Sequence, residues 1–62
     1  MMLANYQTMD INLLFSLVNQ QLRDQFSSLE KLCAYHDIEQ AVLEARLHSA
    51  GFDYLPEANQ FR

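Results

Sequence analysis

The stretch YHDIEQAVLEARLHSAGF, residues 35–52, has the outline of a helix-turn-helix, with a turn, a capped second helix and a glycine stop. Asp37 and Gln40 form a capping signal at the start of that helix. At its end, Gly51 fits the left-handed position that follows many helices and lets the chain fold back onto the last turn. The spacing therefore predicts a helix over about residues 38–50.

Two further helices are expected before this stretch. Asp10 is placed to cap the first of them, and hydrophobic residues recur at helical spacing over about residues 11–25. Ser27 with Glu30 forms a capping box for a short second helix that should end near His36. The core-facing stripe of the first helix is expected to be Ile11, Phe15, Val18 and Leu22.

The end of the sequence, FDYLPEANQFR, predicts a short β-hairpin, because aromatic residues alternate with polar ones around a turn at residues 56–59. Two strands alone are marginal in water, and the N-terminal MLANYQ is the local candidate for a third. We divide the chain into an N-terminal tail or edge strand, residues 1–9, and a single helical domain with a hairpin, residues 10–62. The expected fold class is mainly α, a three-helix bundle resembling a helix-turn-helix or winged helix with a short C-terminal β-hairpin.

Composition limits the classes of protein to consider. The chain has 62 residues and a formal net charge of −4, which repels nucleic-acid phosphates and acidic membrane surfaces. The longest apolar run is far shorter than the ~20 residues of a membrane span. Cys33 is the single cysteine, so no intramolecular disulfide can form, and a lone thiol suits a reducing compartment. We expect a cytoplasmic protein that does not contact a membrane.

Two stretches, SLVNQQLRDQFSSLEKLC and GFDYLPEANQFR, resemble a family of short bacterial proteins known as domain of unknown function 4250. The similarity spans about residues 10–62, and the N-terminal MMLANYQT departs from the family pattern. The resemblance brings no activity with it, so no catalytic role is carried over. The matching positions have the character of caps, core and turn residues: Asn19, Leu22, Arg23, Asp24, Ser28, Leu29, Gly51, Tyr54, Asn59 and Phe61.

The helix-turn-helix outline raises the question of DNA binding, and the charge on the second helix argues against it. Base readout draws on Arg, Asn or Gln, and phosphate neutralisation requires Lys or Arg. The face that would meet the groove has two carboxylates and neither Lys nor Arg. Its positions are Glu39, Gln40, Ala41, Glu44, Ala45 and His48. We expect a structural three-helix core that binds no nucleic acid, with a transcription-related DNA-binding helix-turn-helix domain as the alternative.

Metal binding and catalysis were both considered for Cys33. Cys33 and His36 share one helical face and could bind zinc with His48, but no fourth ligand is evident. Cys33 as a nucleophile with His36 as its base lacks an oxyanion donor, and a thiol on an apolar stripe is normally inert. We therefore expect no metal, no cofactor, no small-molecule ligand and no enzymatic activity.

The first helix has more apolar surface than one small domain normally covers. Its outer edge includes Leu13, Leu14 and Leu17, and the third helix adds a second apolar edge. We assign a partner interface to Leu13, Leu14, Leu17, Ala41, Val42 and Ala45. Two explanations remain open: another copy or another protein docks there, or the N-terminal tail folds over the excess. The preferred hypothesis is a non-enzymatic protein-interaction module that forms a homodimer through apolar helix faces.

Overall fold

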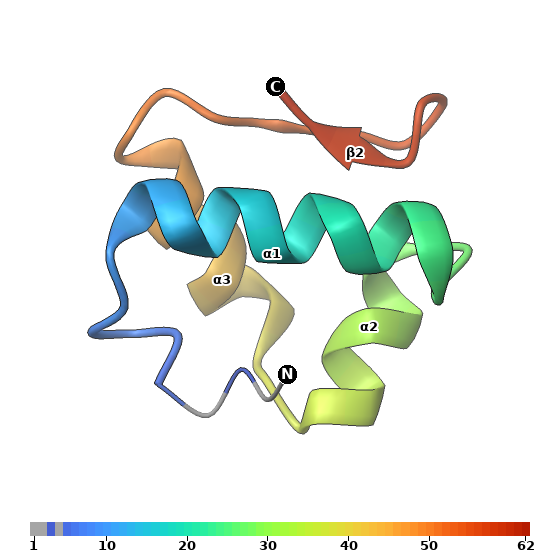
Figure 1. The fold of residues 1–62 in the computed structure, drawn as a ribbon, viewed down its shortest axis with the longest axis horizontal. Coiled ribbons are helices and arrows are strands. Elements are labelled where there is room, and N and C mark those ends of the chain that lie inside the picture. Colours follow the sequence, from blue (N-terminus) through green and yellow to red (C-terminus); the bar gives the residue numbers. More distant parts are fainter. Residues whose placement is uncertain (1–2, 4) are drawn as a thin grey trace.

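The computed structural model describes residue 3 and residues 5–62. It contains three helices followed by a two-stranded antiparallel hairpin, which confirms the expected fold class. Figure 1 shows the hairpin along one side of α1, with α2 and α3 against the other side. The elements are α1 (Ile11–Asp24), α2 (Leu29–His36), α3 (Gln40–His48), β1 (Tyr54–Leu55) and β2 (Gln60–Phe61).

Helix α1 begins as predicted and buries a different stripe. The Asp10 carboxylate accepts a hydrogen bond from the main-chain N–H of Leu13 (3.0 Å), so Asp10 is the expected cap. The expected core stripe is partly wrong, because Ile11 and Phe15 are only partly buried. Phe15 faces the segment after α3 and stacks on Phe52, with 4.0 Å between ring centroids. The buried residues of α1 are Leu14, Val18, Gln21 and Leu22.

The cap of α2 lies one residue later than predicted. Ser28, not Ser27, is the N-cap, and its hydroxyl accepts from the main-chain N–H of Lys31 (3.2 Å). With Ser28 as the cap, Lys31 occupies the third helical position, so the capping box predicted from Ser27 and Glu30 does not form. The helix ends at His36 as expected.

Asp37 stops α2 and does not cap α3, so its predicted role is wrong. Asp37 has a φ of 57°, in the left-handed region, and the main-chain N–H of Ile38 reaches back to the carbonyl of Cys33 (2.9 Å). An aspartate tolerates this conformation better than most side chains do. The N-cap of α3 is instead Glu39, which makes no side-chain cap hydrogen bond.

The end of α3 confirms the glycine stop. Gly51 has a φ of 89° and its main-chain N–H donates to the carbonyl of His48 (2.8 Å). The N–H of Phe52 donates to the carbonyl of Leu47 (3.0 Å), and these two bonds form a Schellman motif. Leu43 and Leu47 are fully buried, as the helix-turn-helix register predicts.

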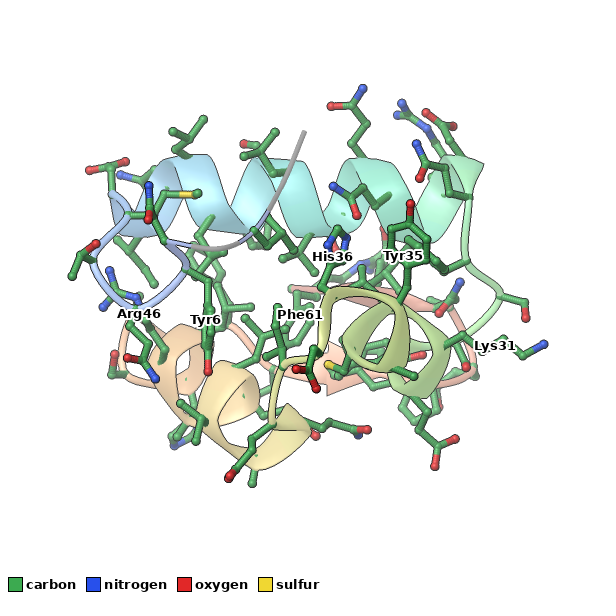
Figure 2. All side chains as sticks on the ribbon, turned by 90° about the horizontal axis from the view of Figure 1, so that it is seen from below. Tyr6, Lys31, Tyr35, His36, Arg46 and Phe61 are labelled. Atoms are coloured by element: carbon green, nitrogen blue, oxygen red, sulfur yellow. The ribbon has the colours of Figure 1, made fainter. Side chains whose placement is uncertain are left out.

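The described part of the N-terminal segment, residue 3 and residues 5–9, lies against α3 and contains no strand; residues 2 and 4 of the predicted third strand lie outside the described residues. The described sheet has two strands only, and residues 5–8 form turns. Leu3 is fully buried in the core. The guanidinium of Arg46 on α3 donates to the main-chain carbonyls of Tyr6 (2.8 Å) and Met9, which holds the segment against the helix. Figure 2 shows Arg46 beside this segment, with Tyr6 next to α3.

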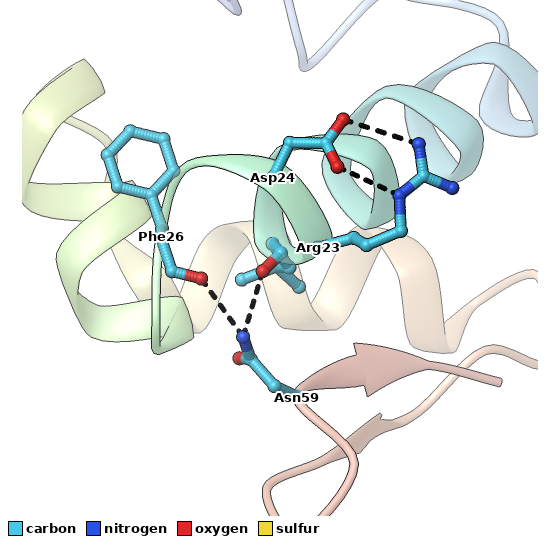
Figure 3. Close-up of polar contacts among 5 residues, drawn as sticks. Arg23, Asp24, Phe26 and Asn59 are labelled. Atoms are coloured by element: carbon cyan, nitrogen blue, oxygen red, sulfur yellow. Dashed lines mark hydrogen bonds and ion pairs between the residues drawn. The ribbon is translucent and has the colours of Figure 1, made fainter.

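The hairpin is joined to α1 through two asparagines. Tyr54 pairs with Phe61, and the Phe61 side chain is buried. Asn59, in the turn, donates to the carbonyls of Leu22 and Phe26 (both 3.0 Å), as Figure 3 shows. The amide of Asn19 bonds both main-chain groups of Phe61. The hairpin is therefore part of the single core. The fully or nearly fully buried hydrophobic residues are Leu3, Leu14, Val18, Leu22, Leu29, Leu32, Cys33, Leu43, Leu47 and Phe61.

Candidate functional site

The structure divides the three leucines assigned to a partner interface on α1. Leu13 is 48% exposed and does not pack against the core. Leu17 is partly buried and touches the core from its edge. Leu14 is fully buried in the chain's own core, so its assignment to an interface is wrong. The reason is helical geometry: Leu14 lies about 100° round the helix from Leu13, whereas Leu17 lies only about 40° from it.

The outward side of α1 from residue 12 to residue 20 carries no ionisable side chain, and the Asp10 carboxylate borders it at the start of the helix. We define the α1 outer face as Asn12, Leu13, Ser16, Leu17 and Gln20. Apart from Leu17, these residues are exposed, and none of the five is ionisable. No charged residue occurs in α1 before Arg23, near its C-terminal end. In a chain with twelve charged residues among 62 (four Lys and Arg plus eight Asp and Glu), the α1 outer face is an uncharged surface with apolar side chains on it.

The residues assigned to the interface on α3 belong to a second surface. Ala41 and Ala45 are exposed and Val42 is partly buried. Ala41 and Ala45 line a hollow against the chain around Tyr54, and neither Val42 nor any residue of α1 lines that hollow. The structure therefore does not bring the leucines of α1 and the alanines of α3 together in one patch.

The exposed side of α3 is acidic, as the sequence indicates. Glu39 is exposed and Glu44 is partly buried beside Gln40, whose side-chain amide donates to the Glu44 carboxylate (2.9 Å). The arginine of this helix, Arg46, is used inside the fold, because its guanidinium bonds the carbonyls of the N-terminal segment. On α1, Arg23 pairs with Asp24 (2.9 Å), which raises the pKa of Arg23 and lowers the pKa of Asp24. Arg46 is therefore engaged within the fold, and Arg23 lies at the surface beside a carboxylate.

The three residues considered for a metal site lie in different surroundings. Cys33 is buried, and burial, with a smaller contribution from Glu44, raises the pKa of its thiol to about 11. His36 pairs with Gln21, and His48 pairs with Asp53 at the surface (2.6 Å). Among the described residues, no group of three His, Cys, Asp or Glu side chains comes together in a way that could hold a metal ion. The Cys33 thiol therefore remains protonated at neutral pH, which removes its nucleophilic character.

Sequence analysis missed a buried polar pair between α1 and α2. The side chain of Gln21 is buried, and its Oε1 lies 2.7 Å from Nε2 of His36. This geometry requires that Nε2 carries the proton and donates. Nδ1 of His36 is buried without a hydrogen-bond partner, and burial lowers the pKa of His36. The available signal was Gln21 itself, which sits at a core-facing helical position between Val18 and Leu22.

An exposed aromatic side chain covers this pair. Tyr35 is 72% exposed, and its ring meets that of His36 edge-on, with 5.1 Å between centroids. Phe26 packs against both rings. Figure 2 shows Tyr35 and His36 side by side on α2, facing α1. Tyr35 thus shields the imidazole from water on one side, which contributes to the burial that lowers the pKa of His36.

Three helices with a left-handed turn between α2 and α3, followed by a hairpin packed on α1, define a small helix-turn-helix-like domain of the winged type. The sequence matches the family "Domain of unknown function (DUF4250)" over residues 8–61, and the chain belongs to this family. The match confirms the resemblance found in the sequence and begins two residues before the region expected from it.

No curated protein and no solved structure matches the chain. Within the described part of the chain, no helix is both long enough and apolar enough to cross a membrane. The family match shows the family and the structure shows the fold. The surfaces of the domain are the basis for inferring an activity or a partner.

Proposed function

We propose that this domain is a non-enzymatic protein-interaction module that associates with a second copy of itself through the α1 outer face. The observation that supports the proposal is the 48% exposure of Leu13 on a helix whose outward residues 12–20 carry no charge, with the capping carboxylate of Asp10 at the N-terminal border of this face. Removing a leucine side chain fully from water stabilises by about 1.5–3 kcal/mol. Around a two-fold axis, the same side chain is buried in both copies.

The net charge favours this face over other surfaces for self-association. Each copy carries a formal charge of −4, so two copies repel one another wherever their acidic surfaces approach. The α1 outer face has no ionisable side chain of its own, so two such faces bring fewer like charges together than the acidic surfaces do, and Asp10 lies only at the N-terminal border of the face. Asn12, Ser16 and Gln20 supply hydrogen-bonding groups beside the leucines, which suits the partly polar character of interfaces between proteins.

The absence of enzymatic activity is part of the proposal. Its support is the state of the groups with catalytic potential: the thiol of Cys33 is buried and protonated, and Nδ1 of His36 is buried. His48 and Asp53 form an exposed pair, and the nearby hydroxyl of Ser49 donates to the carbonyl of Arg46 instead of to the imidazole. We place the protein in the cytoplasm, where a lone thiol stays reduced.

The test is the oligomeric state of two variants over a concentration series in sedimentation velocity. We expect the wild-type chain to dimerise as its concentration rises and Leu13→Glu to stay monomeric, because the substitution sets two carboxylates against each other across the axis. Gln25→Glu adds the same charge at an exposed residue outside the α1 outer face and should still dimerise. A wild-type chain that sediments as a monomer at every concentration would contradict the proposal.

DNA binding is the second candidate function, and the arrangement of α2, α3 and the hairpin is the observation that favours it. Two observations argue against DNA binding. Glu39 is exposed on the side that would enter the groove, and the Arg46 guanidinium is hydrogen-bonded to the main chain of the N-terminal segment. A mobility-shift titration with mixed-sequence duplex DNA at low salt separates the two functions, because non-specific binding is strongest there. We expect no retardation, and a shifted duplex at low protein concentration would favour the DNA-binding function instead.

A further inference from the structure

The two outer edges of the hairpin differ in main-chain hydrogen bonding: the edge of β2 is bonded to a side chain (closed), and the edge of β1 is not (open). Asp53 and Arg62 exchange both main-chain hydrogen bonds (2.8 and 2.9 Å), so in an antiparallel ladder the groups of the next pair, Tyr54 and Phe61, point outward. On the β2 side, Oδ1 of Asn19 accepts from the N–H of Phe61 (2.7 Å) and its Nδ2 donates to the carbonyl of Phe61 (3.0 Å). On the β1 side, no described residue bonds the main-chain N–H or carbonyl of Tyr54.

Two neighbouring hollows are lined by Tyr54, the residue at the open edge. One hollow of about 420 Å³ lies between α3 and the segment around Tyr54, and a second of similar volume runs from there to the start of α2 and Pro56. Glu44 and Tyr54 line both hollows, so the two lie next to each other. We define the α3–β1 groove by Ala41, Glu44, Ala45, Asp53, Tyr54 and Glu30. The two alanines leave room beside the strand that larger side chains would fill.

The lining of the α3–β1 groove is acidic. Glu30, Glu44 and Asp53 contribute carboxylates, and neither Lys nor Arg lines either hollow. His48 is the one basic side chain at the rim, and it pairs with Asp53. A second copy of this chain would bring the same carboxylates to the groove region, so its charge does not complement the groove. Lysine or arginine side chains do.

We propose that the α3–β1 groove binds an extended segment of a partner protein that carries lysine or arginine side chains. The segment adds to the outer edge of β1 and exchanges two main-chain hydrogen bonds with Tyr54. Its alternate side chains point into the groove, where Glu44 of α3 and Asp53, just before β1, receive the basic groups beside the small side chains of Ala41 and Ala45. Pro56 has no N–H to offer, so the added strand is short.

The test uses NMR titration of the labelled full chain with a capped peptide of alternating valine and lysine, and with a matched peptide in which glutamate replaces lysine. We expect the lysine peptide to shift the amide signals of Tyr54, Ala41 and Ala45. The amide of Tyr54, which has no acceptor among the described residues, should exchange with solvent more slowly when the peptide is bound. Slower exchange distinguishes main-chain pairing from a loose attraction between opposite charges.

Substitutions at surface residues test where the peptide binds without removing any core side chain. Glu44→Gln removes one carboxylate, and Ala45→Leu fills the groove at an exposed helical position; each should weaken binding by roughly tenfold or more. Glu39→Gln removes an equal charge from a residue that lines neither hollow and should bind as the wild type does. Equal binding of the glutamate peptide, an unprotected Tyr54 amide, or no shift at Ala45 would each overturn the proposal. None of these results depends on dimerisation through α1.

Discussion

Asn59 shows how a single side chain joins the hairpin to the helices. Its amide nitrogen donates to two carbonyls, those of Leu22 and Phe26, at the C-terminal end of α1 and just beyond it. Its Oδ1 accepts from the hydroxyl of Tyr54 (2.7 Å), and its φ of 51° is one that asparagine tolerates. Asn59 thus provides hydrogen-bond partners for two carbonyls at and just beyond the end of α1 and for the Tyr54 hydroxyl, and its backbone adopts the left-handed conformation of the hairpin turn.

We expect Asn59→Ala to destabilise the domain by about 1–3 kcal/mol, because buried partners lose their hydrogen bonds. Alanine also disfavours the left-handed backbone, so Asn59→Gly, which tolerates it, should lose less stability. Urea unfolding of both variants measures the difference, with Asn12→Ala as an exposed control. If Asn59→Ala unfolded at the wild-type urea concentration, the bridge would have no energetic role.

Titration of His36 makes the stability of the folded domain depend on pH. Its pKa is lowered in the folded protein by burial, so near the ordinary pKa of 6.5 the unfolded chain binds the proton more readily than the folded chain does. Stability is therefore full above this pH and is lost as the pH falls toward the folded pKa. In the folded state a proton on Nδ1 would find no acceptor among the described residues.

The prediction is that acidification from about pH 7.5 to about pH 5.5 lowers the melting temperature of the wild-type chain more than that of His36→Gln. Glutamine keeps an amide group near Gln21 and does not titrate. Carboxylates contribute equally to both proteins, so the difference between the two pH profiles reports on His36. Parallel profiles would mean that the imidazole titrates equally in the folded and unfolded states.

At the scale of elements, the hairpin completes the core. It supplies Phe61, which is buried, and Phe52, just before it, stacks on Phe15 of α1. Asn19 holds the main chain of β2 against α1 through two hydrogen bonds. Two short strands would not be stable alone, and the packing on α1 replaces the missing third strand.

Truncation of the chain after Ala50 should therefore abolish cooperative unfolding. The truncated chain loses the Gly51 stop of α3, the Phe52 stack and the buried Phe61 together. Circular dichroism during heating is the measurement, and a broad, non-cooperative loss of helical signal is the expected result. A sharp transition near the full-length melting temperature would show that the hairpin is dispensable.

Sequence reasoning succeeded where the signal was local. The cap at Asp10, the stop at Gly51 and the hairpin depend on a few neighbouring residues, and all three are confirmed. It failed where tertiary packing decided between similar neighbours. Ser27 and Ser28 are equal candidates for a cap, and only the burial of Leu29 selects the second. Asp37 suits an N-cap and a left-handed turn equally well, and the contact of Ile38 with the core selects the turn.

The candidate site was only partly predictable for a similar reason. Periodicity shows that α1 has a wide apolar arc but not how the helix is rotated about its axis, so the pattern alone does not reveal that Leu14 is fully buried. The open edge at Tyr54 depends on how the hairpin pairs, and the closed edge at Phe61 depends on Asn19, which is far away in sequence. No local pattern carries that information.

At the scale of the whole molecule, Arg46 fastens the N-terminal segment to α3. Its guanidinium bonds two main-chain carbonyls, and the segment it holds delivers Leu3 to the core and packs Tyr6 and Met9 against it. The segment therefore covers part of the apolar surface of the helices. Leu13 remains 48% exposed.

Arg46→Met should release the N-terminal segment and destabilise the domain by about 1.5–3 kcal/mol, the range for hydrogen bonds to a charged group. Methionine keeps the length and apolar stem of the side chain, and Lys31→Met at an exposed residue controls for the lost charge. Limited digestion with chymotrypsin should cut after Tyr6 faster in Arg46→Met. Equal cleavage rates in the two variants would contradict the anchoring role.

The two asparagine bridges also govern when the domain can fold during synthesis. The side chain of Asn19 is hydrogen-bonded to Phe61, 42 positions further along the chain. The carbonyl of Leu22 accepts a hydrogen bond from Asn59, 37 positions further along the chain. Helix α1 leaves the ribosome early, but its buried face cannot be closed until residues 59–61 have followed it out of the exit tunnel. Closing this face of α1 therefore requires residues 59–61, and a chain that lacks them leaves apolar surface of α1 uncovered.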